Sequence, residues 1–148
     1  MKDKKERVID AVEATKVASL EGIVAGGGIT LLEASEKIKE SLRPENISEY
    51  EELEGAKIVM RALKTPIEKL LLNAGENLKI LDAINPAKNI GYDVVNKKIG
   101  NMFEMGIIDP TRVIKEVVQN AISVAGMILI TESVIGPEEL IPTRNIEE

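Results

Sequence analysis

Four features of this chain have residue types that could do chemistry: the glycine run Gly26-Gly27-Gly28 and three aspartates, Asp10, Asp93 and Asp109. An aspartate can act as a general base, orient a water molecule or accept a hydrogen bond from a ligand hydroxyl. A glycine run ahead of a helix offers bare amides and no Cβ atoms, which suits an anion or a closely approaching ligand. Each feature also has a purely structural explanation, and none is decisive taken singly.

The structural explanations are a turn, a cap and a surface ion pair. The glycine run lacks the Lys-Ser/Thr pair of a P-loop, so its alternative is a tight turn between packed helices. Asp109 precedes Pro110 and is equally typical of a helix N-cap. Asp10 follows Arg7 by one helical turn, so the alternative to a general base is an exposed ion pair worth about 0.3 kcal/mol. Asp93 lies in an irregular stretch, where an aspartate is most often a turn residue.

The composition excludes several classes of site. The chain of 148 residues contains no cysteine and no histidine, which rules out disulfides, thiolate or histidine metal sites, and Ser–His or Cys–His nucleophile pairs. Any metal would have to be a hard cation such as Mg²⁺ held by carboxylates, and no metal ligands are predicted. The formal net charge of −6, with no basic stripe to offset it, predicts that the chain does not bind nucleic acid.

The start of the chain and its most apolar run bear on location. The first residues are charged rather than apolar, so no signal peptide is predicted and the cytoplasm is the expected location. The most apolar run, residues 121–130, is far shorter than the roughly 20 residues that a membrane span needs. We therefore expect no membrane segment and interpret this run as part of a buried core helix.

The hydrophobic pattern predicts an all-α, multihelical single domain. Hydrophobic residues make up 44% of the chain and aromatic residues 2%, so one core would consist of small and aliphatic side chains, which favours packing of helix on helix. A first helix is predicted over residues 2–21, with Gly22 in the position of a C-terminal cap. A short apolar step at residues 23–25 then leads through the glycine run into a second helix.

Two capping boxes predict two successive helices in the middle of the chain. The first box pairs Ser48 with Glu51. The second pairs Thr65 with Glu68, next to Pro66 in the first helical position, and would open a separate helix.

The remainder of the chain is predicted from periodicity and breakers. Residues 78–84 should form a short helical piece, and residues 88–99 lose the helical period, which indicates a loop or a small β-hairpin. Asp109 and Pro110 should open the longest helix. The tail after Thr131 is expected to be loose or to need a partner.

Several long motifs follow one another along the chain. They are Arg7-Val8-Ile9-Asp10-Ala11-Val12-Glu13-Ala14-Thr15, Glu21-Gly22-Ile23-Val24-Ala25-Gly26-Gly27-Gly28, Gly91-Tyr92-Asp93, Gly100-Asn101-Met102, Met105-Gly106-Ile107-Ile108-Asp109-Pro110-Thr111, and the stretch from Ala125-Gly126 to Thr131-Glu132. In this order they resemble the group I chaperonins, the GroEL-like family, over almost the whole chain. The resemblance implies the C-terminal portion of a subunit: residues 1–21 as the descending end of the intermediate domain, and residues 22–148 as the second half of the mainly helical equatorial ATPase domain.

The resemblance implies roles for individual residues in an ATP site. Asp10 matches the acid that positions the hydrolytic water. Gly27, with Gly26 beside it, matches the glycine next to the ribose, and Asp109 matches the carboxylate that binds the ribose hydroxyls. The glycines are thereby assigned to the ribose, whereas helix-terminus chemistry alone favoured phosphate.

The base side of the site is implied in the same way. Asp93, Val94 and Val95 match the segment around adenine, and Ile107 matches an apolar contact to the base. Val94 is larger than the alanine common at this position of the family.

The family's two phosphate loops, Thr-Leu-Gly-Pro-Lys-Gly and Asp-Gly-Thr-Thr-Thr with its magnesium carboxylate, occur nowhere in these residues. The resemblance therefore implies one part of an ATP-dependent folding machine, with Mg²⁺ bound only in the complete subunit. Its partners would be other subunits of a homo-oligomeric ring and unfolded client proteins. The chain alone is expected to self-associate and not to hydrolyse ATP. The alternative is a stand-alone helical oligomerisation or interaction module without ATPase activity.

Overall fold

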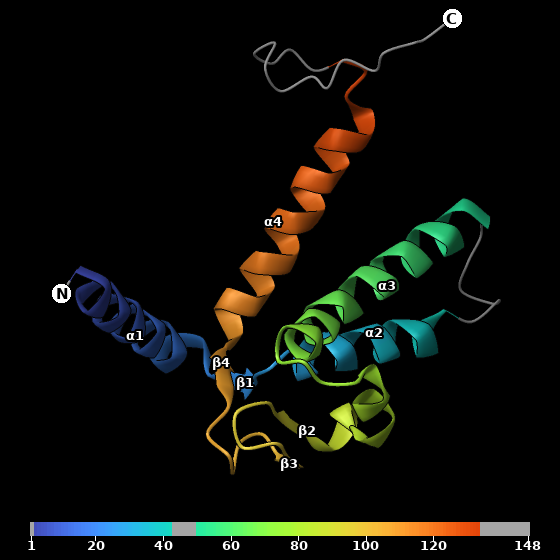
Figure 1. The fold of residues 1–148 in the computed structure, drawn as a ribbon. Coiled ribbons are helices and arrows are strands. Elements are labelled where there is room, and N and C mark those ends of the chain that lie inside the picture. Colours follow the sequence, from blue (N-terminus) through green and yellow to red (C-terminus); the bar gives the residue numbers. More distant parts are fainter. Residues whose placement is uncertain (1, 43–49, 134–148) are drawn as a thin grey trace, which may run out of the picture. The chain divides into compact units, whose positions relative to one another are not determined.

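The computed structural model describes residues 2–42 and 50–133, and helices dominate it, which confirms the predicted multihelical fold (Figure 1). Its elements in chain order are α1 (Lys2–Glu21), β1 (Ile23–Ala25), α2 (Ile29–Ser41), α3 (Tyr50–Asn73), the 3-10 helices η1 (Leu78–Ala83) and η2 (Pro86–Lys88), β2 (Ile90–Asp93), β3 (Lys98–Asn101), β4 (Ile108–Pro110) and α4 (Thr111–Ile130). The chain divides into two compact units, Met1–Lys115 and Glu116–Glu148.

Helix α1 has the predicted bounds and ends at Gly22, whose φ of 81° and N–H bond to the carbonyl oxygen of Ala18 (2.9 Å) close the helix. The apolar step that follows is strand β1. It pairs antiparallel with β4, so that Val24 lies opposite Asp109. Residues from the two ends of the first unit therefore meet in one small sheet.

This pairing corrects the predicted start of the last helix. Asp109 and Pro110 belong to β4, and α4 begins only at Thr111. The backbone of β4 is paired with β1, and the Thr111 N–H donates to the carbonyl oxygen of Gly22 (3.1 Å). Asp109 is therefore a strand residue and not the helix N-cap, because sheet pairing fixes its backbone in an extended conformation.

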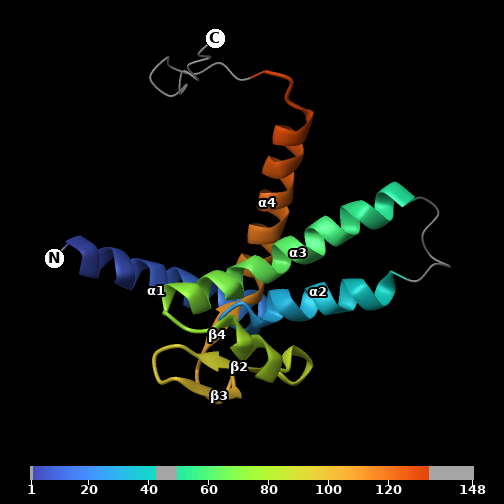
Figure 2. The same cartoon turned by 45° about the vertical axis from the view of Figure 1, so that its right-hand side comes forward.

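Helices α2 and α3 run side by side and form the core with the segments beside them (Figures 1 and 2). The buried cluster consists of Ala25, Ile29, Leu32, Ile67 and Met102. Between the two helices, the fully buried Ser35 donates its hydroxyl hydrogen to the carbonyl oxygen of Met60 (2.9 Å), so the polar group buried in this interface is satisfied.

Helix α3 is continuous where two helices were predicted. Pro66 lies inside it, and the Thr65 hydroxyl donates to the carbonyl oxygen of Arg61 (3.4 Å), four residues earlier, instead of capping a new helix. The reason is the buried stripe Leu63, Ile67 and Leu71. Burying three such side chains is worth about 1.5–3 kcal/mol each, which outweighs the roughly 3 kcal/mol cost of an interior proline.

With 24 residues, α3 and not α4 (20 residues) is the longest of the described helices. The other predicted capping box depends on Ser48, which lies outside the described residues.

Residues 78–84 and 88–99 follow their predictions. The first stretch is 3-10 helix η1, and the Asn77 side chain caps it by accepting a hydrogen bond from the Lys79 N–H (2.9 Å). The second contains the antiparallel hairpin β2–β3, in which Asp93 lies opposite Lys98. The hairpin, rather than the loop, is therefore the correct alternative.

Helix α4 contradicts the prediction of a buried core helix. All residues from 121 to 130 are exposed, and Leu129 is 85% exposed. Among residues 116–133 of the second unit, α4 is the only helix. The tail beyond residue 133, predicted to be loose or to need a partner, lies outside the described residues.

Helix α4 is longer than the apolar run, residues 121–130, on which the membrane prediction was based. Helix α4 contains an 18-residue stretch with a mean hydropathy of 1.6 and is long and apolar enough, by length and composition, to cross a membrane. The prediction of no membrane segment was based on residues 121–130 alone, whereas the whole helix runs from Thr111 to Ile130. Such a signal is weak, because a core helix whose neighbours belong to another segment or subunit passes the same test.

Candidate functional site

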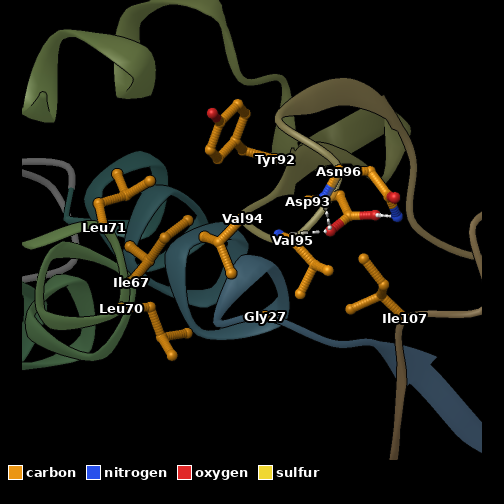
Figure 3. Close-up of a pocket in the computed structure, with 10 residues that line it drawn as sticks. All are labelled: Gly27, Ile67, Leu70, Leu71, Tyr92, Asp93, Val94, Val95, Asn96 and Ile107. Atoms are coloured by element: carbon orange, nitrogen blue, oxygen red, sulfur yellow. Dashed lines mark hydrogen bonds between the residues drawn. The ribbon is translucent and has the colours of Figure 1, made fainter. Parts of the chain in front are cut away.

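A pocket of about 470 Å³ lies within the first unit, between the glycine turn, the end of α3 and the turn of the β2–β3 hairpin (Figure 3). Its volume falls in the range of small-molecule sites. Its lining residues are Gly27, Ile67, Leu70, Leu71, Tyr92, Asp93, Val94, Val95, Asn96 and Ile107. Five residues singled out from the sequence therefore converge here from three separate segments: Gly27, Asp93, Val94, Val95 and Ile107.

The glycine run is a tight turn that also forms one wall of the pocket. Gly27 and Gly28 have φ values of 63° and 81°, in the left-handed region that glycine adopts without strain. Gly26 donates its N–H to the carbonyl oxygen of Ile107 (2.9 Å), and a Cβ at Gly28 would stand 3.0 Å from the Cβ of Ile67. The structural explanation of the run is confirmed. It does not compete with a ligand role, since the turn brings Gly27 to the pocket.

Asp93 shapes the turn that forms the opposite wall. It is 8% exposed, and one carboxylate oxygen accepts hydrogen bonds from the N–H groups of Val95 (2.9 Å) and Asn96 (3.1 Å). The other oxygen accepts a bond from the Asn96 side-chain amide (2.7 Å), as Figure 3 shows. These donors, the Asn96 side chain first, lower the pKa of Asp93. The prediction of a turn residue is thus confirmed.

The turn presents apolar side chains to the pocket. Val94 and Val95 follow Asp93, and Val95 is 84% exposed. Ile107 and the α3 residues complete a largely apolar lining (Figure 3). Such walls can take up a flat apolar group and remove it from water, which would also cover Val95.

Asp109 and Gly26 lie beside the pocket but do not line it. Asp109 is half-buried in β4, two residues along the chain from Ile107, and burial raises the pKa of its carboxyl. No hydrogen bond or ion pair to the Asp109 carboxylate is found within residues 2–42 and 50–133. Asp109 is therefore a carboxylate with unused acceptor capacity in a partly desolvated position.

Asp10 is not brought to the pocket. It lies exposed on α1, whose apolar face includes Val8, Ala11 and Val12. The ion pair predicted between Arg7 and Asp10 is not formed in the part of the chain that the structure describes. Both side chains are exposed, and water solvates such charges about as well as a surface partner does.

Sequence reasoning missed the α3 wall and the polar contacts behind the hairpin. Ile67, Leu70 and Leu71 carry only a core signal in the sequence, and only the fold turns them toward a pocket. Tyr92 is adjacent to Asp93 and could have been included on that ground. Its hydroxyl lies beside Glu76, and burial together with this carboxylate raises the pKa of Tyr92. No pattern in the sequence links Glu76 to the hairpin.

Within the described ranges, no group of three or more acidic side chains is placed to hold a metal ion. The largely apolar lining of the pocket suits the organic part of a ligand.

A multihelical domain whose pocket joins a glycine turn, a helix end and a hairpin turn fits the class of protein that the motifs implied. Residues 1–139 match the model of the TCP-1/cpn60 chaperonin family, and the chain belongs to this family. Within it, the chain is 45% identical over 136 residues to a protein named "Chaperonin GroEL, chloroplastic" from Cyanidioschyzon merolae (strain NIES-3377 / 10D). The match covers 91% of this chain and 25% of that relative, so the chain spans about a quarter of the length of the relative. The resemblance to group I chaperonins is confirmed.

Proposed function

We propose that this chain is part of an ATP-dependent chaperonin subunit, in which it supplies the ribose and adenine side of the ATP site and the hydrolytic carboxylate, Asp10. The observation that carries the proposal is the pocket, which gathers Gly27, the turn at residues 93–95 and Ile107 from distant parts of the chain. Its volume and apolar lining suit a nucleoside.

The base is assigned to the apolar part of the pocket. Adenine between Ile107 and the valines of the turn would cover apolar surface that is otherwise in water, with Val95 gaining most. The Asp93 carboxylate already accepts three hydrogen bonds within its own turn. Its role in this proposal is therefore to fix the turn, and direct recognition of the base is left to the backbone and the apolar side chains.

The ribose is assigned to the side of Gly27 and Asp109. A half-buried carboxylate without donors costs free energy, and the two hydroxyls of a ribose would supply them. Gly27 lines this side of the pocket with its backbone. A Cβ there would stand 2.9 Å from Met102 Cε, so a larger residue would disturb the turn that presents this backbone to the sugar.

The phosphates and Mg²⁺ are assigned to residues outside this chain. ATP hydrolysis depends mainly on positioning the phosphates and stabilising their charge. Asp10 would orient the attacking water only where α1 is brought to a site that the rest of the subunit completes. We accordingly expect the isolated chain to show no steady-state phosphate release above a protein-free blank. Release that Asp10→Ala abolishes would contradict this.

The wider context is part of the same proposal. The complete subunit would act in the cytoplasm, in a homo-oligomeric ring that assists the folding of unfolded client proteins, without contact with nucleic acid or membrane.

The test uses a chimeric subunit, in which this chain replaces the matching quarter of the chloroplastic relative. Val95→Glu should weaken binding of a fluorescent adenine nucleotide by about tenfold or more, since it places a charge in the apolar site and repels the phosphates. Val95 is exposed, so the fold should be unaffected. The matched control is Ile99→Glu, an exposed apolar residue of the same hairpin outside the pocket. Equal affinities for the chimeric subunit and both variants would refute the assignment.

The second candidate is a stand-alone helical oligomerisation or interaction module. The exposed apolar residues of α4 favour it, since they offer an association surface without any nucleotide. A chimeric subunit that fails to bind nucleotide, together with an isolated chain that forms a defined oligomer, would decide for this module.

A further inference from the structure

Glu76 lies where the α3 wall of the pocket ends. Gly75, with a φ of 72°, closes α3, and its N–H donates to the carbonyl oxygen of Leu72 (3.0 Å). The Glu76 N–H donates to the carbonyl oxygen of Leu71 (2.9 Å). These two bonds form a Schellman cap, which fixes the backbone of Glu76 against the helical turn that supplies Leu70 and Leu71 to the pocket.

The side chain of Glu76 reaches both ends of the opposite wall. It is 17% exposed, and its Oε1 lies 3.3 Å from the Nζ of Lys97. Tyr92 lies beside the same carboxylate, whose negative charge opposes ionisation of the Tyr92 hydroxyl and helps to raise its pKa. Tyr92 belongs to β2, just before the turn, and Lys97 is the last turn residue before β3. The carboxylate therefore lies near both ends of the turn and forms an ion pair at the second of them.

The turn itself needs an external support. Asp93 fixes its internal shape through three hydrogen bonds but does not connect it to α3. Lys97 holds a φ of 54°, a left-handed conformation that is unfavourable for a side chain of this kind. Within residues 50–76 and 90–101, no hydrogen bond and no other ion pair than Glu76–Lys97 joins α3 or its cap to the hairpin.

We propose that Glu76 is a positioning residue for the nucleotide pocket: its backbone is fixed in the cap of α3, and its ion pair with Lys97, beside Tyr92, ties the hairpin turn to the end of α3 and holds the two pocket walls at a fixed separation. The proposal rests on the proposed function, because it assumes that the pocket takes the nucleoside. Glu76 does not line the pocket, so it acts only through the turn.

A stability role alone does not account for this arrangement. Oε1 of Glu76 is buried, and Lys97 approaches it without a hydrogen bond. A buried carboxylate oxygen that lacks a hydrogen bond costs stability, and its exposed lysine partner returns little. The defined effect of the contact is therefore on the position of the turn.

The first test measures adenine nucleotide affinity by titration calorimetry in the chimeric subunit. If Glu76→Ala lets the turn leave its binding position for two-thirds to nine-tenths of the time, the apparent Kd rises about three- to tenfold. Glu76→Gln, which keeps the length of the side chain and loses the ion pair, should have a smaller effect. Glu104→Ala and Glu104→Gln are the matched controls, because Glu104 is an exposed acid outside the pocket, and both should bind like the unchanged subunit.

The second test follows the Tyr92 hydroxyl without any nucleotide. The chain has two tyrosines and no tryptophan, so Tyr50→Phe leaves Tyr92 as the only phenol, and its ionisation can be followed by ultraviolet absorbance. Glu76→Gln in this background should lower the pKa of Tyr92, because a neutral amide no longer opposes the phenolate. Glu104→Gln should leave it unchanged.

The outcomes separate this inference from the proposed function. A weaker affinity together with a lowered Tyr92 pKa supports it. A chimeric subunit that binds nucleotide with equal affinity in all variants overturns the role of Glu76 alone. An affinity loss without any change at Tyr92 also overturns it, because the effect then does not pass through this contact. A chimeric subunit that binds no nucleotide refutes the proposed function and this inference with it.

Discussion

Two regions of the molecule, the core beside the pocket and helix α4, are built from the same kinds of aliphatic side chain. Only the core buries these side chains. Ile29, at the start of α2, is 1% exposed, whereas Ile128 in α4 is 68% exposed. Helices α2 and α3 turn back on each other, while the second unit has α4 as its only described helix. Apolar spacing therefore predicts which face of a helix requires a partner. It does not predict whether the partner belongs to the same chain.

Helix α1 resembles α4 in this respect. Its residues Val8 and Val12 are 63% and 48% exposed, and its candidate catalytic residue, Asp10, is exposed as well. The pocket has apolar walls from three segments, whereas the residue proposed for hydrolysis lies on a helix that is largely exposed. Substitutions in the pocket should therefore affect binding of the base, whereas substitution of Asp10 should affect hydrolysis.

The largest expected effect concerns hydrolysis on the α1 side of this comparison. In the chimeric subunit, Asp10→Ala should slow ATP hydrolysis by ~10²–10⁴-fold, the usual contribution of a general acid–base group, and leave nucleotide affinity nearly unchanged. Phosphate release and nucleotide titration measure the two quantities. Glu13→Ala, an exposed acid on the same helix, is the control. Unchanged hydrolysis would mean that Asp10 is only a solvated surface carboxylate.

The second effect compares two isoleucines directly. Ile29→Ala should lower the free energy of unfolding by about 2–5 kcal/mol, because it opens a cavity in the core. Ile128→Ala should change it by less than about 0.5 kcal/mol in dilute monomer. Denaturant titrations of the 148-residue chain provide both values. A large loss for Ile128→Ala in monomeric protein would show that α4 is buried within a single chain after all.

The third effect is association through α4. We expect the isolated chain to self-associate, since a contiguous exposed apolar face beyond a few hundred Å² is rare on stable monomers. Ile122→Glu with Leu129→Glu should weaken the association constant at least about tenfold, since each removes apolar surface worth about 25 cal/mol per Å². Light scattering over a dilution series measures this. A monodisperse monomer at all concentrations would contradict the expectation.

The smallest expected effects are on the pH dependence of stability. Asp93 and Asp109 should contribute to this dependence with opposite signs. Asp93 has a lowered pKa in the folded chain, so its stabilisation is present above its ordinary pKa near 3.8 and is lost as the pH falls through the folded value. Asp109 has a raised pKa, so the folded chain binds its proton more tightly, and stability falls as the pH rises from 3.8 through the folded value.

Substitution by asparagine separates the two contributions. Asp93→Asn should remove part of the acid-induced loss of stability, whereas Asp109→Asn should make that loss steeper, because it removes a group that favours the folded chain at low pH. Thermal unfolding between pH 3 and 6 measures both slopes. Parallel curves for the two variants would contradict the assigned burial of Asp109.

Local signals in the sequence were enough for much of the fold. The end of α1 at Gly22, the short helical piece after Asn77 and the turn at Asp93 each depend on neighbours along the chain, and each was predicted, although the 3-10 type of the helical piece was not. The errors concern residues governed by distant contacts. Pro66 stays inside α3 because Ile67 is buried against α2, and Asp109 is a strand residue because β1 pairs with it.

Some residues of the candidate site could be predicted from the sequence, and others are recognised only in the fold. The family resemblance singled out Gly27, Asp93 and Ile107, which the fold brings together. The α3 wall and Glu76 could not be found from the sequence, because their relation to the hairpin exists only after α3 has packed. The position of Asp10 relative to a bound nucleotide stays a prediction.

The pairing of β1 with β4 has a consequence for biosynthesis. It joins residues 23–25 to residues 108–110, and the pocket needs Gly27 from one end and Ile107 from the other. Closing so long a loop costs conformational entropy, whereas a helix forms from local contacts without this cost. Contacts of high sequence separation also form slowly. On a ribosome that adds about 5–20 residues per second, α1, α2 and α3 emerge seconds before β4 does. The pocket should therefore be the last part of the first unit to mature, and a nascent chain stalled before residue 107 should contain its helices but no nucleotide site.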